Sequence, residues 1–371
     1  MKVVAQKKLA LTNISGKNKQ DRLKGFVLAP FHANEQFKKV IIQPDIFCDA
    51  DRLPPLNFAP AAIKVSVTAN KKKVKLKESS KRQFIKYLES IRSNNFKKIV
   101  AARVVKKKKP ATFNAVDYFQ LLCKMYPHAF VSLVFTKEYG LWIGATPEIL
   151  LSVHQHEFKT YSLAGTKENT KVNTRNIWGK KEREEQKIVS DYIQKTFAAI
   201  TQEKPRIEGP KTITAGNLLH LRTTFSYRSI STVDWHKIVD RLHPTPAVAG
   251  YPKQEAIDFI LKNEKTNRSF YSGYLGPVNL DKEVNLFVNL RCMNVLKNKL
   301  LVYVGCGITA DSNFADEWKE TEIKSETLLS LLNQKKSFTK VSKTLAPLAE
   351  HEYQQKKRSP NRRNMPAKRN P

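Results

Sequence analysis

Two short stretches of the chain place glutamates at helical spacing, although basic side chains outnumber acidic ones by 66 to 33. Glu317 and Glu320 lie three residues apart in DEWKETEIK, and Glu182 and Glu185 repeat this spacing in KKEREEQKIV. Residues at i and i+3 share one face of a helix, so each pair is either a solvated acidic face or a place where a cation binds. Four carboxylates from two helices suit Mg2+, which takes one or two carboxylates directly and keeps several of its waters.

Glycines and an arginine mark places that suit an anionic ligand. Gly305 and Gly307 end an apolar strand in VYVGCGIT, shortly before the DEWKETEIK stretch. Glycines let backbone N–H groups approach a ligand, and the N-terminus of a following helix favours an anion. Gly165 and Thr166 offer a similar backbone and a hydroxyl in YSLAGTKEN. Arg291 lies within the apolar run VNLRCMNVL, where a guanidinium needs a carboxylate partner from either the protein or a ligand.

A lysine and a glutamate next to apolar strands are candidates for proton transfer. Lys97 and Lys98 lead the strand-like run FKKIVAARVV, and alternation along a strand sends one of them inward and the other to solvent. A lysine desolvated at the edge of a site can serve as a base. Glu148 follows a proline turn in WIGATPEILLS, and burial there would raise its pKa so that it acts as an acid.

The composition limits the class of protein. The net charge is +33, but the lysines are spread along the whole chain, which favours solubility and encounter with an anionic small molecule over nucleic-acid binding. No apolar run reaches the ~20 residues that a membrane span needs, and the N-terminus lacks a secretory signal. The four scattered cysteines lack CxxC spacing, which argues against a zinc site or a disulfide framework. We therefore expect a protein of the reducing cytoplasm.

The elements around these residues mix two periodicities. Helical patterns cover 81–94, 115–126, 180–200 and 316–334. Short β-branched or aromatic runs predict strands at 25–31, 39–44, 96–105, 129–135, 139–146, 149–154, 270–280, 284–296 and 299–309. Because strands and helices do not alternate as βαβ units, the pattern predicts an α+β fold on large antiparallel sheets. From about residue 335 to residue 371 the chain is polar, basic and proline-containing, which predicts a disordered tail.

Taken together and in order, these motifs closely resemble the chorismate-utilising enzymes, namely isochorismate, salicylate, anthranilate and aminodeoxychorismate synthases. The matching stretches are KIVAAR, GATPEILL, LAGTK, KEREEQKIV, GNLLHL, LHPTPAVAGYPKQEA, RSFYSGYLGPV, NLRC and VGCGITADSNFADEWKETEIK. The resemblance implies a chorismate-binding catalytic domain over residues 1–334. It also implies an α+β fold with a large two-layered antiparallel β-sandwich, peripheral helices and the site between the layers.

The resemblance also implies roles for individual residues. Glu185 and Glu320 correspond to direct Mg2+ ligands, and Glu182 and Glu317 to their water-mediated partners. Gly165 and Thr166 correspond to a loop that touches the ring carboxylate and the metal. The remaining substrate-binding positions implied by the family are His220, which faces the ring, Ala247, Tyr271, Arg291, Gly305, Cys306, Gly307 and Lys324.

Family members differ in the nucleophile that attacks ring carbon C2. Aminodeoxychorismate synthases use a lysine where this chain has Ala164, and salicylate synthases typically carry a threonine where it has Ala247. The resemblance therefore implies an isochorismate synthase that needs Mg2+ but no glutaminase subunit, with Lys98 activating water at C2 and Glu148 protonating the leaving C4 hydroxyl. Gln186 stands where the family commonly has histidine.

Three alternatives stay open from the sequence. A salicylate synthase would release pyruvate in a second step, and another chorismate-utilising enzyme would use a different nucleophile. A protein of a different class would use the basic surface, and above all the basic tail, to bind nucleic acid. The metabolic use of the product, in menaquinone or siderophore biosynthesis, is not decided by the sequence.

Overall fold

The computed structural model describes residues 24–44, 76–93, 95–169, 177–201, 203–215, 218–228 and 234–332. It also describes three short strands nearer the N-terminus, β1 (Lys2–Ala5), β2 (Thr12–Asn13) and β5 (Ile46–Asp49), of which β1 and β5 pair with each other. The tail predicted for residues 335–371 lies outside the described residues. Within the described part of the chain, no helix is long and apolar enough to cross a membrane.

The other described strands form two antiparallel sheets. The larger sheet has nine strands, in the order β11 (Arg206–Ala215), β12 (Leu218–Arg228), β10 (Glu157–Glu168), β9 (Ile149–His154), β15 (Glu283–Val288), β14 (Tyr274–Leu280), β3 (Gly25–Ala29), β4 (Val40–Ile42) and β2. The smaller sheet has six strands, in the order β13 (Gly250–Tyr251), β6 (Lys98–Lys108), β17 (Lys299–Ile308), β16 (Cys292–Val295), β8 (Gly140–Thr146) and β7 (Phe130–Thr136).

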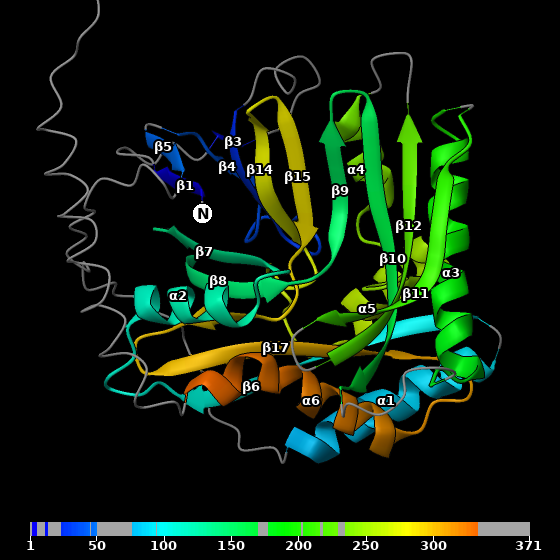
Figure 1. Ribbon diagram of the computed structural model, residues 1–371. Coiled ribbons are helices and arrows are strands. Elements are labelled where there is room, and N and C mark those ends of the chain that lie inside the picture. Colours follow the sequence, from blue (N-terminus) through cyan, green and yellow to red (C-terminus); the bar gives the residue numbers. More distant parts are fainter. Residues whose placement is uncertain are drawn as a thin grey trace, which may run out of the picture.

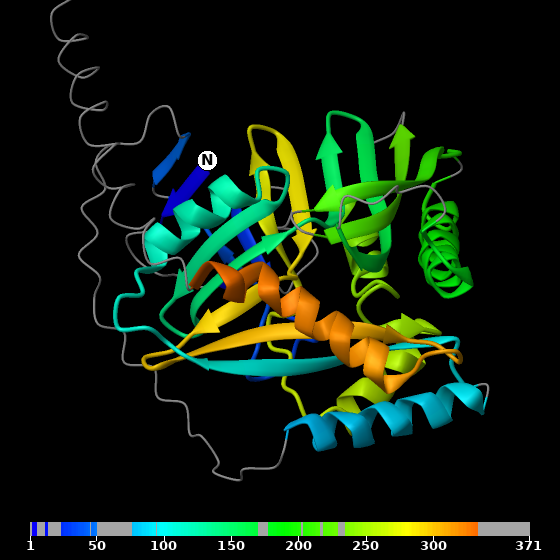
Figure 2. The same ribbon diagram turned by 60° about the horizontal axis from the view of Figure 1, so that its bottom comes forward.

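Helices cover the outer faces of this pair of sheets (Figure 1). They are α1 (Leu76–Arg92), α2 (Ala115–Met125), α3 (Lys180–Ala198), α4 (Trp235–Leu242), α5 (Lys253–Asn263) and α6 (Phe314–Leu332). In Figure 1, α3 lies along β10, β11 and β12 of the larger sheet. Figure 2 shows α6 lying across the smaller sheet over β17, with α1 beside it.

The hydrophobic core follows these layers. Between the two sheets, Leu28 and Leu275 of the larger sheet pack with Trp142 and Tyr303 of the smaller sheet. One outer cluster packs α3 and α4 on the larger sheet, and another packs α2 and α6 on the smaller sheet. Burying apolar area on both faces of each sheet stabilises the stack by ~25 cal/mol per Å2. The predicted α+β sandwich with peripheral helices is confirmed.

A buried ion pair supports the β13–β6 end of the smaller sheet. The guanidinium of Arg268 pairs with the carboxylate of Glu264, and both side chains are almost fully buried. The same guanidinium donates to the carbonyl oxygens of Val100 on β6 and Val248, each at 2.7 Å. Glu264 in turn accepts from the backbone N–H of Ala102 at 2.9 Å. The pair therefore ties β6 to the segment between α4 and β13.

Candidate active site

A cavity lies where the two sheets meet α3 and α6. Every residue predicted from the sequence to form the site lines this cavity, except Glu182 and Glu317. The lining also includes residues that the sequence did not suggest, namely Val100, Pro147, Leu163, Val248, Leu290, Tyr303 and Val304.

Lys98 and Glu148 both line the cavity. Lys98 begins β6 and is only 3% exposed, whereas Lys97 beside it is exposed, as strand alternation predicted. Glu148 lies between β8 and β9 and is 4% exposed. Burial raises the pKa of Glu148 to about 7, even though the positive charges of Lys98, Lys324 and Arg291 oppose this shift. Glu148 is therefore protonated below about pH 7 and can donate a proton.

The glycines of β17 make room for these side chains. A Cβ atom on Gly307 would lie 2.7 Å from Lys98 Cε and 2.7 Å from Glu185 Oε1. On Gly305 it would lie 2.8 Å from the Tyr271 hydroxyl. Between them, Cys306 also lines the cavity, and burial raises the pKa of its thiol well above its ordinary value. The strand therefore needs glycine at both positions because side chains from β6 and α3 and from the segment before β14 occupy the space.

Gly165 and Thr166 lie within β10 rather than in a loop, which corrects that part of the prediction. The pairing of β10 with β12 shifts register between Ala164 and Lys167, so the two residues form a bulge. Gly165 has φ +69°, a left-handed conformation that favours glycine, and the Trp178 ring packs 2.7 Å from where a Cβ would be. The bulge turns this backbone toward the cavity.

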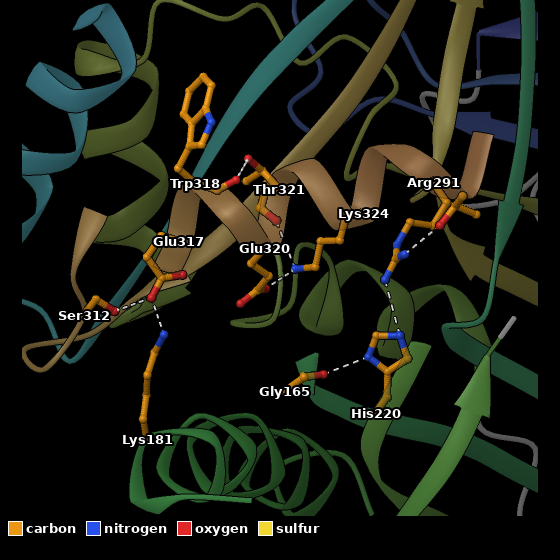
Figure 3. Close-up of polar contacts among 12 residues, drawn as sticks. Gly165, Lys181, His220, Arg291, Ser312, Glu317, Trp318, Glu320, Thr321 and Lys324 are labelled. Atoms are coloured by element: carbon orange, nitrogen blue, oxygen red, sulfur yellow. Dashed lines mark hydrogen bonds and ion pairs between the residues drawn. The ribbon is translucent and has the colours of Figure 1, made fainter. Parts of the chain in front are cut away.

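Arg291 and His220 meet at a wall of the cavity, where Arg291 also contacts the C-terminal half of α6 (Figure 3). Burial, reinforced by Arg291, lowers the pKa of His220 to about 3, so the imidazole is neutral. Its Nδ1–H donates to the Gly165 carbonyl at 2.7 Å, which leaves Nε2 to accept from Arg291 Nη2 at 3.3 Å. Arg291 Nη1 donates to Thr327 Oγ1 at 3.0 Å. The neutral His220 thus orients the Arg291 guanidinium but does not neutralise its positive charge.

Arg291 lacks the internal carboxylate partner that the sequence left as one alternative. Within the described ranges, no Asp or Glu forms an ion pair with it. Its backbone is in the left-handed region at φ 48°, which is unusual for a residue other than glycine and breaks the path from β15 to β16. A buried guanidinium held in this way is suited to a ligand carboxylate.

Acidic side chains from α3 and α6 face each other across the mouth of the cavity. Glu185 on α3 is 8% exposed, and Glu317 on α6 is 1% exposed. Burial raises the pKa of Glu185, and burial together with the charge of Glu320 raises the pKa of Glu317 to about 7. Although burial disfavours the charge of Glu320, Lys324 holds its pKa below the ordinary value. Burial therefore disfavours the charges of Glu185 and Glu317, whereas Lys324 favours that of Glu320.

Lysines and a serine partly satisfy these carboxylates (Figure 3). Lys324 pairs with Glu320 and donates to the Gly305 carbonyl at 3.0 Å. Lys181 reaches across from α3 to pair with Glu317, which also accepts from the Ser312 hydroxyl at 2.8 Å. The second carboxylate oxygen of Glu317, Oε2, is buried and has no hydrogen-bond partner.

Comparison with known proteins identifies the family. The model of the family described as "chorismate binding enzyme" matches residues 12–333 of the chain. The chain belongs to the chorismate binding enzyme family. Isochorismate synthase EntC of Escherichia coli K12 is 26% identical over 241 residues, which cover 63% of this chain and 62% of that protein. The chain thus matches less than two thirds of that relative's length.

Solved structures share the fold of this chorismate binding enzyme. A structure from Bacillus anthracis, named as the 2,3-dihydroxybenzoate-specific isochorismate synthase DhbC, has a TM-score of 0.69 and 25% identity and covers 83% of each chain. MenF, the menaquinone-specific isochorismate synthase of Escherichia coli, has a TM-score of 0.69 at 20% identity, covering 85% of this chain and 80% of its own. The resemblance to the chorismate-utilising enzymes is confirmed.

The acidic cluster of this chorismate binding enzyme has the donor chemistry for Mg2+, with one departure. Among the described residues, no group of three or more candidate ligands is assembled closely enough to hold a metal ion. Glu182 instead accepts the Gly179 backbone N–H at 2.8 Å and caps its own helix. Glu185, Glu317 and Glu320 nevertheless supply oxygens, and the unpartnered Oε2 of Glu317 calls for a cation. The oxygens of these three carboxylates are of the kind that a hard divalent ion binds, although the described residues are not drawn together as a ligand group.

Lys181 and Ser312 contact the acidic cluster and were also missed by the sequence analysis. Lys181 stands directly before the first acidic pair, but the spacing of α3 does not reveal that its side chain crosses to α6. The Ser312 hydroxyl donates to Glu317, while Asn313 Oδ1 accepts the Asp316 N–H at the start of α6. The sequence feature that could have indicated both residues is their position close to the acidic pairs.

Proposed function

We propose that this protein is an isochorismate synthase, which converts chorismate to isochorismate by adding water at C2 with loss of the C4 hydroxyl. The observation that carries the proposal is the placement of Lys98 and Glu148, a buried base candidate and a buried acid, on the same cavity. The pKa of Glu148, raised by burial to about 7, supports its role as the acid. The reaction is an isomerisation because one water enters and one water leaves.

In the proposed reaction, Lys98 takes a proton from water while the water oxygen forms a bond to C2. The ring double bonds shift, the C4–O bond breaks, and Glu148 gives its proton to the departing hydroxyl, which leaves as water. In the reactive form, Lys98 is an uncharged amine and Glu148 is an uncharged carboxylic acid. Together they carry the same number of protons as a Lys98 ammonium beside a Glu148 carboxylate. After turnover the proton passes back from Lys98 to Glu148, so the same site can run the reaction in reverse.

Other side chains would hold the substrate in place. The free N–H groups of Arg291 are directed by His220 and Thr327, which suits a substrate carboxylate. Lys324 and the backbone of Gly305, Cys306 and Gly307, together with Tyr271 and the Gly165–Thr166 bulge, line the rest of the cavity. Glu185, Glu317 and Glu320 would hold Mg2+. When bound, Mg2+ would neutralise a substrate carboxylate and withdraw electron density from the ring.

Two small side chains favour water as the nucleophile. Ala164 and Ala247 both line the cavity, and Ala164 offers no amine that could attack the ring in place of water. Relatives named isochorismate synthase, including EntC, support the same reaction. Their names also support a role in menaquinone or siderophore biosynthesis, with chorismate as the small-molecule partner. We further propose that the protein acts in the cytoplasm and without a glutaminase subunit.

Product analysis tests the proposal. The protein is incubated with chorismate and Mg2+, and the products are separated by chromatography. We expect isochorismate and chorismate at equilibrium. The absence of isochorismate, or the direct release of pyruvate with salicylate, would refute the proposed function in favour of another member of the family.

A further inference from the structure

Lys181 occupies an unusual position at the acidic cluster. Its side chain starts on α3, crosses to α6 and pairs with Glu317 (Figure 3). The carboxylate of Glu317 is almost fully buried, whereas the lysine side chain remains 26% exposed. The Lys181 ammonium is therefore held at the border between the buried carboxylates and solvent, on a flexible four-carbon stem.

The charges around Lys181 are balanced without a metal. Glu185, Glu317 and Glu320 face three ammonium groups, those of Lys98, Lys181 and Lys324. Lys98 is buried at the catalytic end, and Lys324 is held by both Glu320 and the Gly305 carbonyl. By contrast, a single carboxylate, that of Glu317, holds Lys181 in the described part of the chain. If one cation has to leave this cluster, Lys181 has the shortest path to water, because its side chain is the most exposed of the three.

A divalent cation would compete with Lys181 for the same oxygens. Oε1 of Glu317 already accepts from both Lys181 and Ser312, while Oε2 is buried without a partner. A metal beside Glu317 and Glu320 would lie within a few ångströms of the Lys181 ammonium, and like charges at that distance repel strongly in a partly buried site. The bound divalent cation would then add two positive charges to a cluster whose charges already balance.

We propose that Lys181 is a resident counter-cation of the acidic site, which neutralises Glu317 when no metal is bound and moves to solvent when Mg2+ binds. This inference rests on the Mg2+ site of the proposed function. It assigns to Lys181 a positioning role, because in the metal-free protein the lysine holds α3 and α6 together across the mouth of the cavity. Mg2+ binding must break this contact, so the lysine weakens the apparent affinity for the metal.

The substitution Lys181→Met tests this role because it removes the charge and keeps much of the length of the side chain. Lys180→Met is a matched control, since Lys180 is the neighbouring residue on α3, its side chain is 83% exposed and it lies 3.8 Å from Glu184. Mg2+ affinity is measured by titration calorimetry without chorismate, and thermal unfolding is followed in EDTA and in excess Mg2+. If Lys181→Met does not fold, Lys181→Gln replaces it.

We expect Lys181→Met to bind Mg2+ about tenfold more tightly than the unmodified protein, which corresponds to ~1.4 kcal/mol. The variant should also unfold at a lower temperature in EDTA and gain more from Mg2+, while Lys180→Met should behave like the unmodified protein. Equal or weaker Mg2+ binding by both Lys181 variants would overturn the inference and leave the Mg2+ site intact. An unmodified protein that does not bind Mg2+ would overturn both the inference and the metal site.

Discussion

The substitution Glu148→Gln separates the catalytic role of this carboxyl from its effect on stability. Glutamine has nearly the same shape as a protonated glutamate, but it cannot ionise or donate an acidic proton. Glu148 is 4% exposed, so its ionised form is costly to bury. We therefore expect one variant to lose turnover and, at alkaline pH, to gain stability.

The magnitude follows from the shifted pKa of Glu148. Burial raises this pKa from 4.5 to about 7 in the folded protein, whereas the unfolded chain keeps the lower value. Between these pH values the folded state binds more protons, so the free energy of unfolding falls as pH rises. At ~1.4 kcal/mol per unit, full titration of Glu148 costs ~3 kcal/mol, and this loss should be absent in Glu148→Gln.

Urea denaturation at pH 5 and pH 8 in EDTA measures this difference, and chromatography of isochorismate measures turnover. The free energy of unfolding of the variant, relative to the unmodified protein, should rise by ~2–3 kcal/mol from pH 5 to pH 8. Turnover should fall by ~100-fold or more, as is typical for loss of a general acid. A stability difference that is the same at both pH values, or turnover within tenfold of normal, would refute the reasoning.

Three further substitutions test the geometry of the site. Lys98→Ala should lower turnover by ~100-fold or more while chorismate still binds, and near-normal turnover would contradict its role as base. Gly307→Ala places a Cβ 2.7 Å from both Lys98 Cε and Glu185 Oε1. Kinetics over a range of Mg2+ concentrations should therefore show losses in turnover and in metal affinity, and unchanged kinetics would exclude this packing. Arg268→Met leaves Glu264 buried without its partner, which should lower the free energy of unfolding by ~3–5 kcal/mol. Urea denaturation measures this loss, and a value below ~1 kcal/mol would show that the ion pair contributes little to stability.

The sequence predicted the two-layered fold and much of the site because its signals there are local. Strand alternation predicted that one of Lys97 and Lys98 points inward, the family resemblance implied Lys98, and Lys98 is the buried one. The i,i+3 spacing placed Glu317 and Glu320 on one helix, and both take part in the acidic cluster. The order of the motifs then identified the family before any contact was known.

Other features depend on tertiary contacts that no local pattern encodes. The strands β10, β11 and β12 and the helices α4 and α5 were not predicted. Strands β10 and β12 mix polar residues among apolar ones, and α4 has only 8 residues. The bulge at Gly165 depends on its pairing with β12 and on the ring of Trp178. The helix cap made by Glu182 and the crossing of Lys181 to α6 depend on side-chain directions that spacing alone does not fix.

The most direct test of the proposed reaction is to run it in water labelled with oxygen-18 and to analyse the isochorismate formed. If water activated by Lys98 attacks C2 while Glu148 releases the C4 hydroxyl, early product carries one labelled oxygen, located at C2. Isochorismate without label would show that the hydroxyl moves within the substrate, which would contradict the roles assigned to Lys98 and Glu148.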